Sequence, residues 1–235
     1  MDELNLVLGT ISGGKILDVA TGEGSFIPFM TQHLKDFSEV IGIDRDQEMI
    51  DKANGLNKDN RISFQRMSGD HLEFEDNYFD TVSVSNALHH MNEIDQTLQE
   101  MLRVLKPGGT FLINELFCDD LNEKQLTQAL FHHLQSDIDT ALGICHNKTF
   151  HKEEIEEIVM KLELQNLKSV IHQNEKFNQN VDPEEFSIKY IGLVKKMEHS
   201  EEYEKYSFVL EKLIQRLHKT GIEFAPQVLF VGNKA

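Results

Sequence analysis

The chain has 235 residues, 40% of them hydrophobic, and a formal net charge of −17 at pH 7. A chain of this length can bury one sizeable core, and no Gly/Ser-rich or Pro-rich linker divides it, so we expect a single domain over residues 1–235. The negative charge disfavours nucleic acid as a partner, because non-specific affinity for a phosphate backbone comes from lysine and arginine side chains.

The N-terminal segment MDELNLVLGTISGGK is acidic and lacks the basic start of a signal peptide, and no run of about 18 apolar residues follows it. We therefore expect a cytoplasmic protein without a membrane span. The two cysteines, Cys118 and Cys145, are too few for a disulfide framework and do not form a Cys-x-x-Cys pair. We expect reduced thiols and no bound metal.

Short apolar runs alternate with amphipathic segments through the first half of the chain. The pattern predicts strands at 16–20, 39–44, 62–66, 79–83 and 110–116, and helices at 25–35, 47–53 and 94–105. Pro107 and the two glycines after it should end the last of these helices. Almost wholly apolar strands that alternate with helices are typical of a parallel sheet covered on both faces, which is an α/β three-layer sandwich.

A glycine-bearing turn follows the first strand in the stretch KILDVATGEGSFIPFM, residues 15–30. Its glycines let the backbone approach a ligand, and the helix that follows offers free N–H groups. Asp44 ends the second strand twenty residues after Gly24, where a carboxylate can accept hydrogen bonds from a ribose diol. By itself this pattern fits either a dinucleotide or an adenosyl ligand.

Two residues favour a ligand without phosphates. A dinucleotide fingerprint would have a third glycine where this chain has Ile27. Asp18 lies within the first strand, where a carboxylate suits a cationic ligand better than a pyrophosphate. An NAD-type oxidoreductase is therefore disfavoured but stays open, as does a non-catalytic protein that binds a cofactor or a partner.

Four linked motifs, in order and at ordinary spacing, resemble the Rossmann-like S-adenosylmethionine-dependent methyltransferases, in particular the small-molecule branch that includes ubiquinone and menaquinone biosynthesis enzymes. The motifs are LDVATGEG, IGIDRDQEMI, SGDHLEFEDNYFDTVSVSNALHHM and EMLRVLKPGGTFLI. The resemblance is close over residues 14–115 and only general beyond them. It implies a seven-stranded, mostly parallel sheet with an antiparallel last strand, for which QVLFVGNKA at the C-terminus is the candidate.

The resemblance also implies an activity, a cofactor and the residues that bind it. The enzyme would transfer a methyl group from S-adenosylmethionine to a small-molecule acceptor and release S-adenosylhomocysteine. The methionine portion would lie against Asp18, Ala20, Thr21, Gly22 and Gly24. Many members have glycine at the position of Ala20.

The remaining positions implied by the resemblance surround the ribose, the adenine and the opening to the acceptor. Asp44 would bind the ribose hydroxyls. The adenine would contact Arg45, Met49, Asp70 and the backbone of His71. The methionine end and the opening would be lined by Ser85, Asn86 and His90. The neighbouring His89 either shares this role or packs at a helix start.

Two helical insertions, at about 117–150 and 182–219, interrupt the second half of the chain. The first has an apolar stripe of Leu126, Leu130, Leu134 and Ile138. The second reads as a hairpin of two helices, the first starting at Asp182 and Pro183 with Phe186, Tyr190, Leu193 and Met197 as its stripe. Its second helix should begin at Ser200 and end at Gly221. The side chains of this helix that should face inward are Tyr203, Tyr206, Leu210, Leu213 and Leu217. The insertions would form a lid or a homodimer surface, or simply pack against the sheet.

A histidine in the first insertion is a candidate general base. His133 falls on the apolar stripe, His132 points the opposite way, and Asp137 lies one turn further on. His133 would then face the pocket under the lid, and its alternative is a core or interface histidine. His90 is the rival, and a base is needed only if the acceptor carries a proton. The sequence has no signature of a particular acceptor.

Overall fold

The computed structural model describes residues 3–173 and 181–235, and their centre is one seven-stranded sheet. Its strands are β1 Lys15–Val19, β2 Glu39–Asp44, β3 Ile62–Arg66, β4 Phe79–Ser85, β5 Leu105–Leu116, β6 Gln165–His172 and β7 Gln227–Asn233. Their order is β3-β2-β1-β4-β5-β7-β6. β7 runs antiparallel to both of its neighbours, β5 and β6, and the pairs from β3 to β5 are parallel. The predicted α/β sheet with an antiparallel last strand is confirmed.

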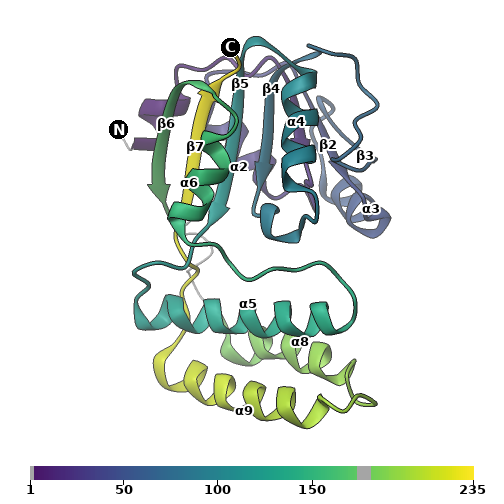
Figure 1. Cartoon of the computed structure of the whole chain (residues 1–235), viewed down its shortest axis with the longest axis vertical. Coiled ribbons are helices and arrows are strands. Elements are labelled where there is room, and N and C mark those ends of the chain that lie inside the picture. Colours follow the sequence, from purple (N-terminus) through teal and green to yellow (C-terminus); the bar gives the residue numbers. More distant parts are fainter. Residues whose placement is uncertain (1–2, 174–180) are drawn as a thin grey trace.

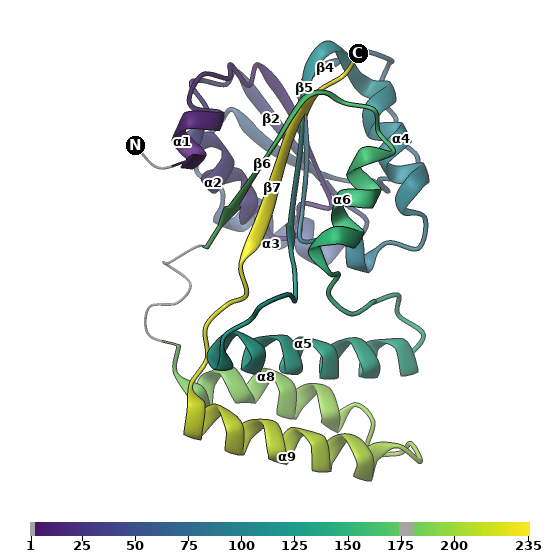
Figure 2. The ribbon, with the colours of Figure 1, turned by 60° about the vertical axis from the view of Figure 1, so that its left-hand side comes forward.

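Helices cover both faces of the sheet because successive strand residues point to opposite sides. On one face, Leu17 and Val19 of β1 join a core with α4 Ile94–Val104 and α6 Lys152–Met160. On the other, Ile16 packs with α1 Glu3–Leu8 and α2 Phe26–His33. The two layers lie on either side of the sheet in Figure 2. α3 Gln47–Leu56 contacts β2 and β3.

The turn before β5 differs from its prediction. α4 ends at Val104 and β5 already begins at Leu105, so the Lys-Pro-Gly-Gly segment belongs to the strand. Pairing with β4 jumps from Leu105 to Thr110, which makes the segment between them a bulge. Gly108, at a φ of 74°, supplies the backbone angle that the bulge requires.

A separate helical layer lies at the carboxyl end of the sheet (Figure 1). It consists of α5 Glu123–Ala141, α8 Pro183–Lys195 and α9 Tyr203–Thr220, which share their own apolar core. The second insertion is thus a helical hairpin as predicted, but it packs on α5 rather than on the sheet. Its role as a dimer surface stays a prediction.

The helix ends of this layer follow local sequence signals. The Asp182 carboxylate accepts from the backbone N–H groups of Glu184 and Glu185, at 2.8 and 3.1 Å, and Pro183 takes the first helical position. Gly221 ends α9 with a φ of 81°. α9 begins at Tyr203, so the start predicted at Ser200 is wrong, because residues of a turn intervene.

The stripe predicted for α5 is confirmed in part. Leu134 and Ile138 are buried in the helical core and Leu130 packs against it, whereas Leu126 is 36% exposed. The expectation for Leu126 is wrong. At this end of α5, Arg216 of α9 binds the Glu123 carboxylate at 2.7 Å. No helix in the described part of the chain is long and apolar enough to cross a membrane.

Candidate active site

A cavity of about 810 Å³ lies beyond the carboxyl ends of β1, β2, β3 and β4. The strand order reverses between β1 and β4, and parallel sheets bind ligands at such a point. Four segments after successive strands line it, and residues of the α5 insertion cover it. The insertion contributes Gln135, Asp139, Ile144 and Cys145. The cavity volume is in the range of pockets that hold cofactors.

The turn after β1 is built from residues in the left-handed region. Ala20, Gly22 and Gly24 have φ angles of 54°, 55° and 80°. A Cβ at Gly24 would lie 2.8 Å from Phe64 Cζ, whereas one at Gly22 would meet no atom within 4 Å. Gly24 therefore allows close packing, and Gly22 leaves the backbone open to the cavity. Ala20 bears a strain of about 1 kcal/mol that glycine would avoid.

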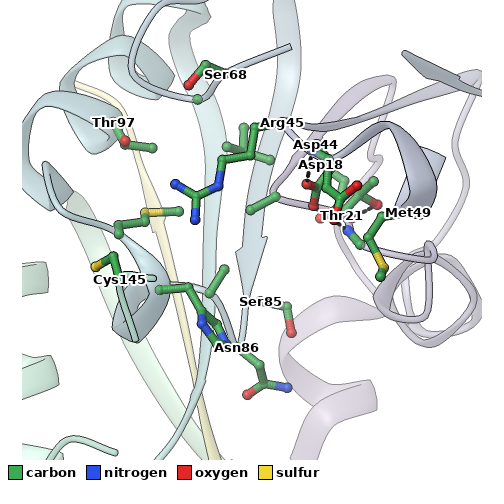
Figure 3. Close-up of a pocket in the computed structure, with 18 of the residues that line it drawn as sticks. Asp18, Thr21, Asp44, Arg45, Met49, Ser68, Ser85, Asn86, Thr97 and Cys145 are labelled. Atoms are coloured by element: carbon green, nitrogen blue, oxygen red, sulfur yellow. Dashed lines mark hydrogen bonds between the residues drawn. The ribbon is translucent and has the colours of Figure 1, made fainter. Parts of the chain in front are cut away.

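Asp18 is a buried carboxyl at the base of the cavity. Its side chain accepts hydrogen bonds from the Thr21 and Ser83 hydroxyls, both at 2.6 Å. Figure 3 shows Asp18 beside Thr21. Burial raises the pKa of Asp18 to about 6, against the lowering effect of both hydroxyls. Ser83 escaped the sequence analysis, although it is a polar residue in an apolar strand and pairs in register with Asp18.

Asp44 joins the glycine turn to the end of β2. Its Oδ2 accepts from the Gly22 N–H and its Oδ1 from the Asp46 N–H, both at 2.9 Å. Arg45 and Met49 line the cavity next to it, and Figure 3 shows the Arg45 side chain reaching across the opening. Asp44, Arg45 and Met49, which were expected around the ribose and the adenine, therefore line one cavity.

The segment after β3 holds Asp70 in place. Asp70 lines the cavity, and its carbonyl accepts from the Gln96 side chain at 2.9 Å. His71 is not among the residues that line the cavity, so the expected contact of its backbone is not seen. Thr97 of α4, which the sequence analysis did not single out, lines the cavity instead.

The segment after β4 supplies the inner wall of the cavity. Ser85 Oγ accepts from Asn114 Nδ2 at 2.9 Å, and Asn114 Oδ1 faces His172 Nε2 at 2.7 Å. Asn86 has a φ of 48°, and its buried Oδ1 accepts no hydrogen bond from any described residue. A buried oxygen of this kind in a cavity wall fits a ligand that brings a donor.

The two candidate histidines have different surroundings. His90 lines the cavity, and burial, together with nearby His89 and His146, lowers the pKa of His90 to about 3. His133 lies outside the cavity lining, with its Nε2 2.8 Å from Thr149 Oγ1.

The predicted orientation of the two α5 histidines is therefore wrong. The apolar stripe of α5 faces α8 and α9, so the opposite, polar face is directed at the sheet. His132 lies on that polar face with Gln135 and Asp139, three and seven residues further on. The polar face of α5 could have indicated this orientation from the sequence, because a helix that covers a polar pocket turns its polar face toward that pocket.

Residues 17–113 match the model of the methyltransferase domain family. The ubiquinone/menaquinone biosynthesis C-methyltransferase of Haemophilus ducreyi is 34% identical over 111 residues. That match covers 46% of this chain and 43% of the relative, so the chain spans less than half of the curated relative's length.

Solved structures show the same fold over nearly the whole chain. The YcgJ protein of Bacillus subtilis has a TM-score of 0.57 at 19% identity, with 98% of this chain and 97% of that chain covered. Phosphoethanolamine N-methyltransferase 2 of Haemonchus contortus, solved with S-adenosylhomocysteine, has a TM-score of 0.56 at 19% identity, with 98% and 52% covered. Residues 17–113 are thus similar to the methyltransferase domain family, and the chain shares the fold of these solved structures.

Proposed function

We propose that the cavity binds S-adenosylmethionine and that the chain transfers its methyl group to a small-molecule acceptor, releasing S-adenosylhomocysteine. The observation that carries the proposal is the convergence of Asp18, Gly22, Asp44 and Asp70 on one cavity. These residues lie far apart in sequence and come from three different strand ends, as a cofactor site at a switch point requires.

The residues present fit the cofactor. The open side of Gly22 and the buried Asn86 Oδ1 would receive the methionine portion, with Asp18 near its ammonium. Asp44, already at the end of β2 beside the turn, would accept from the ribose hydroxyls. Ala20 and Thr21 would flank the methionine portion, and the adenine would lie near Arg45, Met49 and Asp70.

S-adenosylmethionine supplies an electrophilic methyl group, so the protein must hold the acceptor in line and exclude water. Gln135 and Asp139 of α5 cover the cavity, whereas no residue of α8 or α9 lines it. The lid is therefore the α5 insertion, and the hairpin supports the lid from its outer side.

His90 is better placed than His133 to contact the acceptor. A general base works best with a pKa near the working pH, and burial holds the pKa of His90 far below it. We infer that the neutral His90 ring orients the acceptor by donating its one ring N–H to it. With substrate in hand, His90→Asn should lower turnover while His133→Asn does not, and the reverse order would restore His133 as the base.

A small-molecule acceptor is supported by the name of the Haemophilus relative, a quinone-pathway C-methyltransferase. An NAD-type dinucleotide site is disfavoured by Ile27, which is 1% exposed and packs in the core beneath the turn. A glycine in its place would leave a void.

Calorimetric titration with S-adenosylmethionine, S-adenosylhomocysteine and NAD tests the cofactor. We expect the two adenosyl compounds to bind and to raise the melting temperature, and NAD to do neither. Binding of NAD alone would overturn the proposal. Transfer of a labelled methyl group to a panel of phenols, quinols and amines then distinguishes an enzyme from a non-catalytic binding protein.

A further inference from the structure

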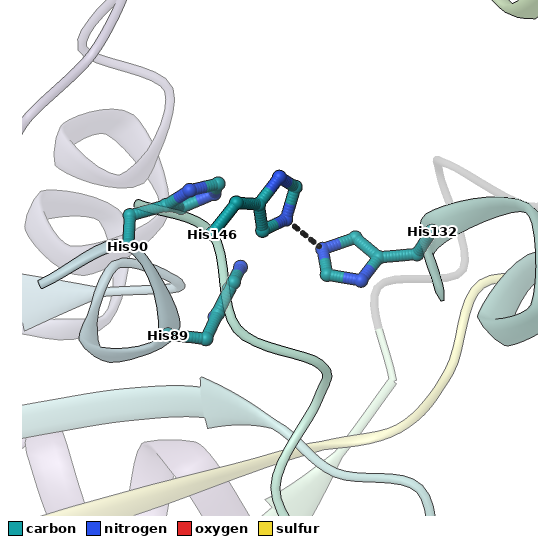
Figure 4. A group of neighbouring side chains, drawn as sticks. All are labelled: His89, His90, His132 and His146. Atoms are coloured by element: carbon teal, nitrogen blue, oxygen red, sulfur yellow. Dashed lines mark hydrogen bonds between the residues drawn. The ribbon is translucent and has the colours of Figure 1, made fainter. Parts of the chain in front are cut away.

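Four histidines converge at one edge of the cavity, where the lid meets the sheet. His89 and His90 belong to the 3₁₀ helix η1 Leu88–His90 after β4, His132 to α5, and His146 to the segment after α5. One ring nitrogen from each lies within 4.8 Å of those from the other three. His146 lies between His90 and His132 in Figure 4.

We propose that His89, His90, His132 and His146 form a binding site for Zn²⁺ or a similar divalent transition metal, which fastens the α5 lid to the carboxyl end of the sheet. This site goes beyond the proposed methyl transfer.

The spacing of the rings suits a metal ion. Zn–N bonds of about 2.0–2.1 Å in a tetrahedron place neighbouring nitrogens roughly 3.4 Å apart. The Nε2 atoms of His132 and His146 are 3.2 Å apart, and all four donors fall within 4.8 Å. Small side-chain rotations therefore bring the four nitrogens onto one ion.

Carboxylates contact the Nδ1 atoms of two of the rings and orient them. His89 Nδ1 is 3.1 Å from Glu115 Oε1, and His146 Nδ1 is 2.7 Å from Asp139 Oδ2. Metal-bound histidines almost always have such a partner, which fixes the tautomer and leaves Nε2 free as the ligand. The two carboxylates would also offset the charge of a divalent cation held by neutral rings.

The unligated cluster leaves one contact poorly matched. The contact between His132 and His146 joins two nitrogens that are both acceptors unless one carries a proton. Metal ions bind the neutral form of imidazole, and burial favours that form over the charged one.

The backbone around the cluster is already fixed. The Asn147 N–H donates to the His89 carbonyl at 2.7 Å, and the Ser136 hydroxyl donates to the His146 carbonyl at 2.6 Å. These bonds tie the segment after α5 both to η1 and to α5. The site is thus held together before any ion binds, which limits the ordering that binding requires.

The ligand set selects the class of metal. Imidazole suits Zn²⁺, Ni²⁺, Cu²⁺ and iron, whereas Mg²⁺ and Ca²⁺ prefer oxygen ligands. Zn²⁺ titration into tag-free, chelator-treated protein at pH 7 is the direct test, with Mg²⁺ as the contrast. We expect one Zn²⁺ per chain, a higher melting temperature with Zn²⁺, and no response to Mg²⁺.

Variants on one helix give a matched comparison. Asp139→Asn removes a residue that only orients His146, so it should lower Zn²⁺ affinity by roughly 10- to 100-fold. His132→Gln removes a ligand and should lower the affinity by more than that. His133→Gln, at the next position of α5 but bonded to Thr149, should leave the affinity unchanged. Equal losses in His132→Gln and His133→Gln would overturn the assignment.

X-ray absorption spectroscopy of the Zn²⁺-loaded wild type identifies the ligands of the metal directly. This measurement does not depend on whether the variants fold. Four imidazole nitrogens at about 2.0–2.1 Å are expected. A sulfur neighbour at about 2.3 Å would place Cys145 on the metal and overturn the four-histidine site. Failure of the protein to hold stoichiometric Zn²⁺ would overturn it as well, whatever the result with S-adenosylmethionine.

Discussion

The Gly22 N–H donates to Asp44 Oδ2 at 2.9 Å, so the glycine turn after β1 is fastened to the end of β2. The same carboxylate accepts from the Asp46 N–H through its other oxygen. One side chain therefore holds the backbone that would face the methionine portion and stands where the ribose would bind. The turn and the carboxylate form one preorganised unit.

Asp44→Ala should weaken S-adenosylmethionine binding by about 2 to 3 kcal/mol, the scale for hydrogen bonds to a charged acceptor. The protein should still fold, because Asp44 lies at a strand end outside the core. Calorimetric titration measures the change, with the exposed Asp51→Ala on α3 as the control. Unchanged affinity in Asp44→Ala would remove this carboxylate from the site.

Gly22→Ala and Gly24→Ala should separate binding from stability. At Gly22 the added Cβ meets no atom, so unfolding free energy should fall by only about 1 kcal/mol, the cost of left-handed strain, while cofactor affinity drops sharply. At Gly24 the Cβ meets the Phe64 ring, and about 1–3 kcal/mol of overpacking adds to the same strain. Urea unfolding together with titration gives both quantities, and equal stability losses would contradict this account.

Asp18 should make the protein more stable toward mildly acidic pH. Its pKa of about 6 in the folded state lies above the ordinary value of 3.8, so between pH 4 and 6 the native state binds more protons than the unfolded state. The contribution of Asp18 to the free energy of unfolding should therefore decrease, by on the order of 3 kcal/mol, as pH rises from 4 through 6 to 7.

The measurement is the free energy of unfolding of the wild type minus that of Asp18→Asn, taken from pH 4 to 7.5. The difference should decline with rising pH. A flat profile for Asp18→Asn would mean that the carboxyl does not titrate in this window.

Leu217→Ala should loosen the lid without loosening the sheet. Leu217 is 1% exposed in the core of α5, α8 and α9, so its truncation should cost about 2–5 kcal/mol within that layer. Hydrogen exchange should speed up in these three helices and stay slow in β1 and β4. Leu126→Ala, at a 36% exposed position, should change little, and uniform loss of protection in Leu217→Ala would make the two layers one cooperative unit.

The sequence by itself determined the strands of the sheet and most of the residues that line the cavity. The short apolar runs of β1 and β5, the glycines after β1 and the acids at strand ends are local signals, each contained within a few residues. The N-cap of α8 at Asp182 and the end of α9 at Gly221 were also predicted from local signals, because each residue satisfies backbone groups of its own helix.

Only the tertiary structure decided which face of α5 looks into the cavity. An amphipathic stripe shows that one face is buried but not what buries it, and here the partner is the α8–α9 hairpin rather than the pocket. That choice placed His132 beside His89, His90 and His146 and left His133 bonded to Thr149. Contacts between different elements depend on how whole elements pack, and no local pattern encodes that packing.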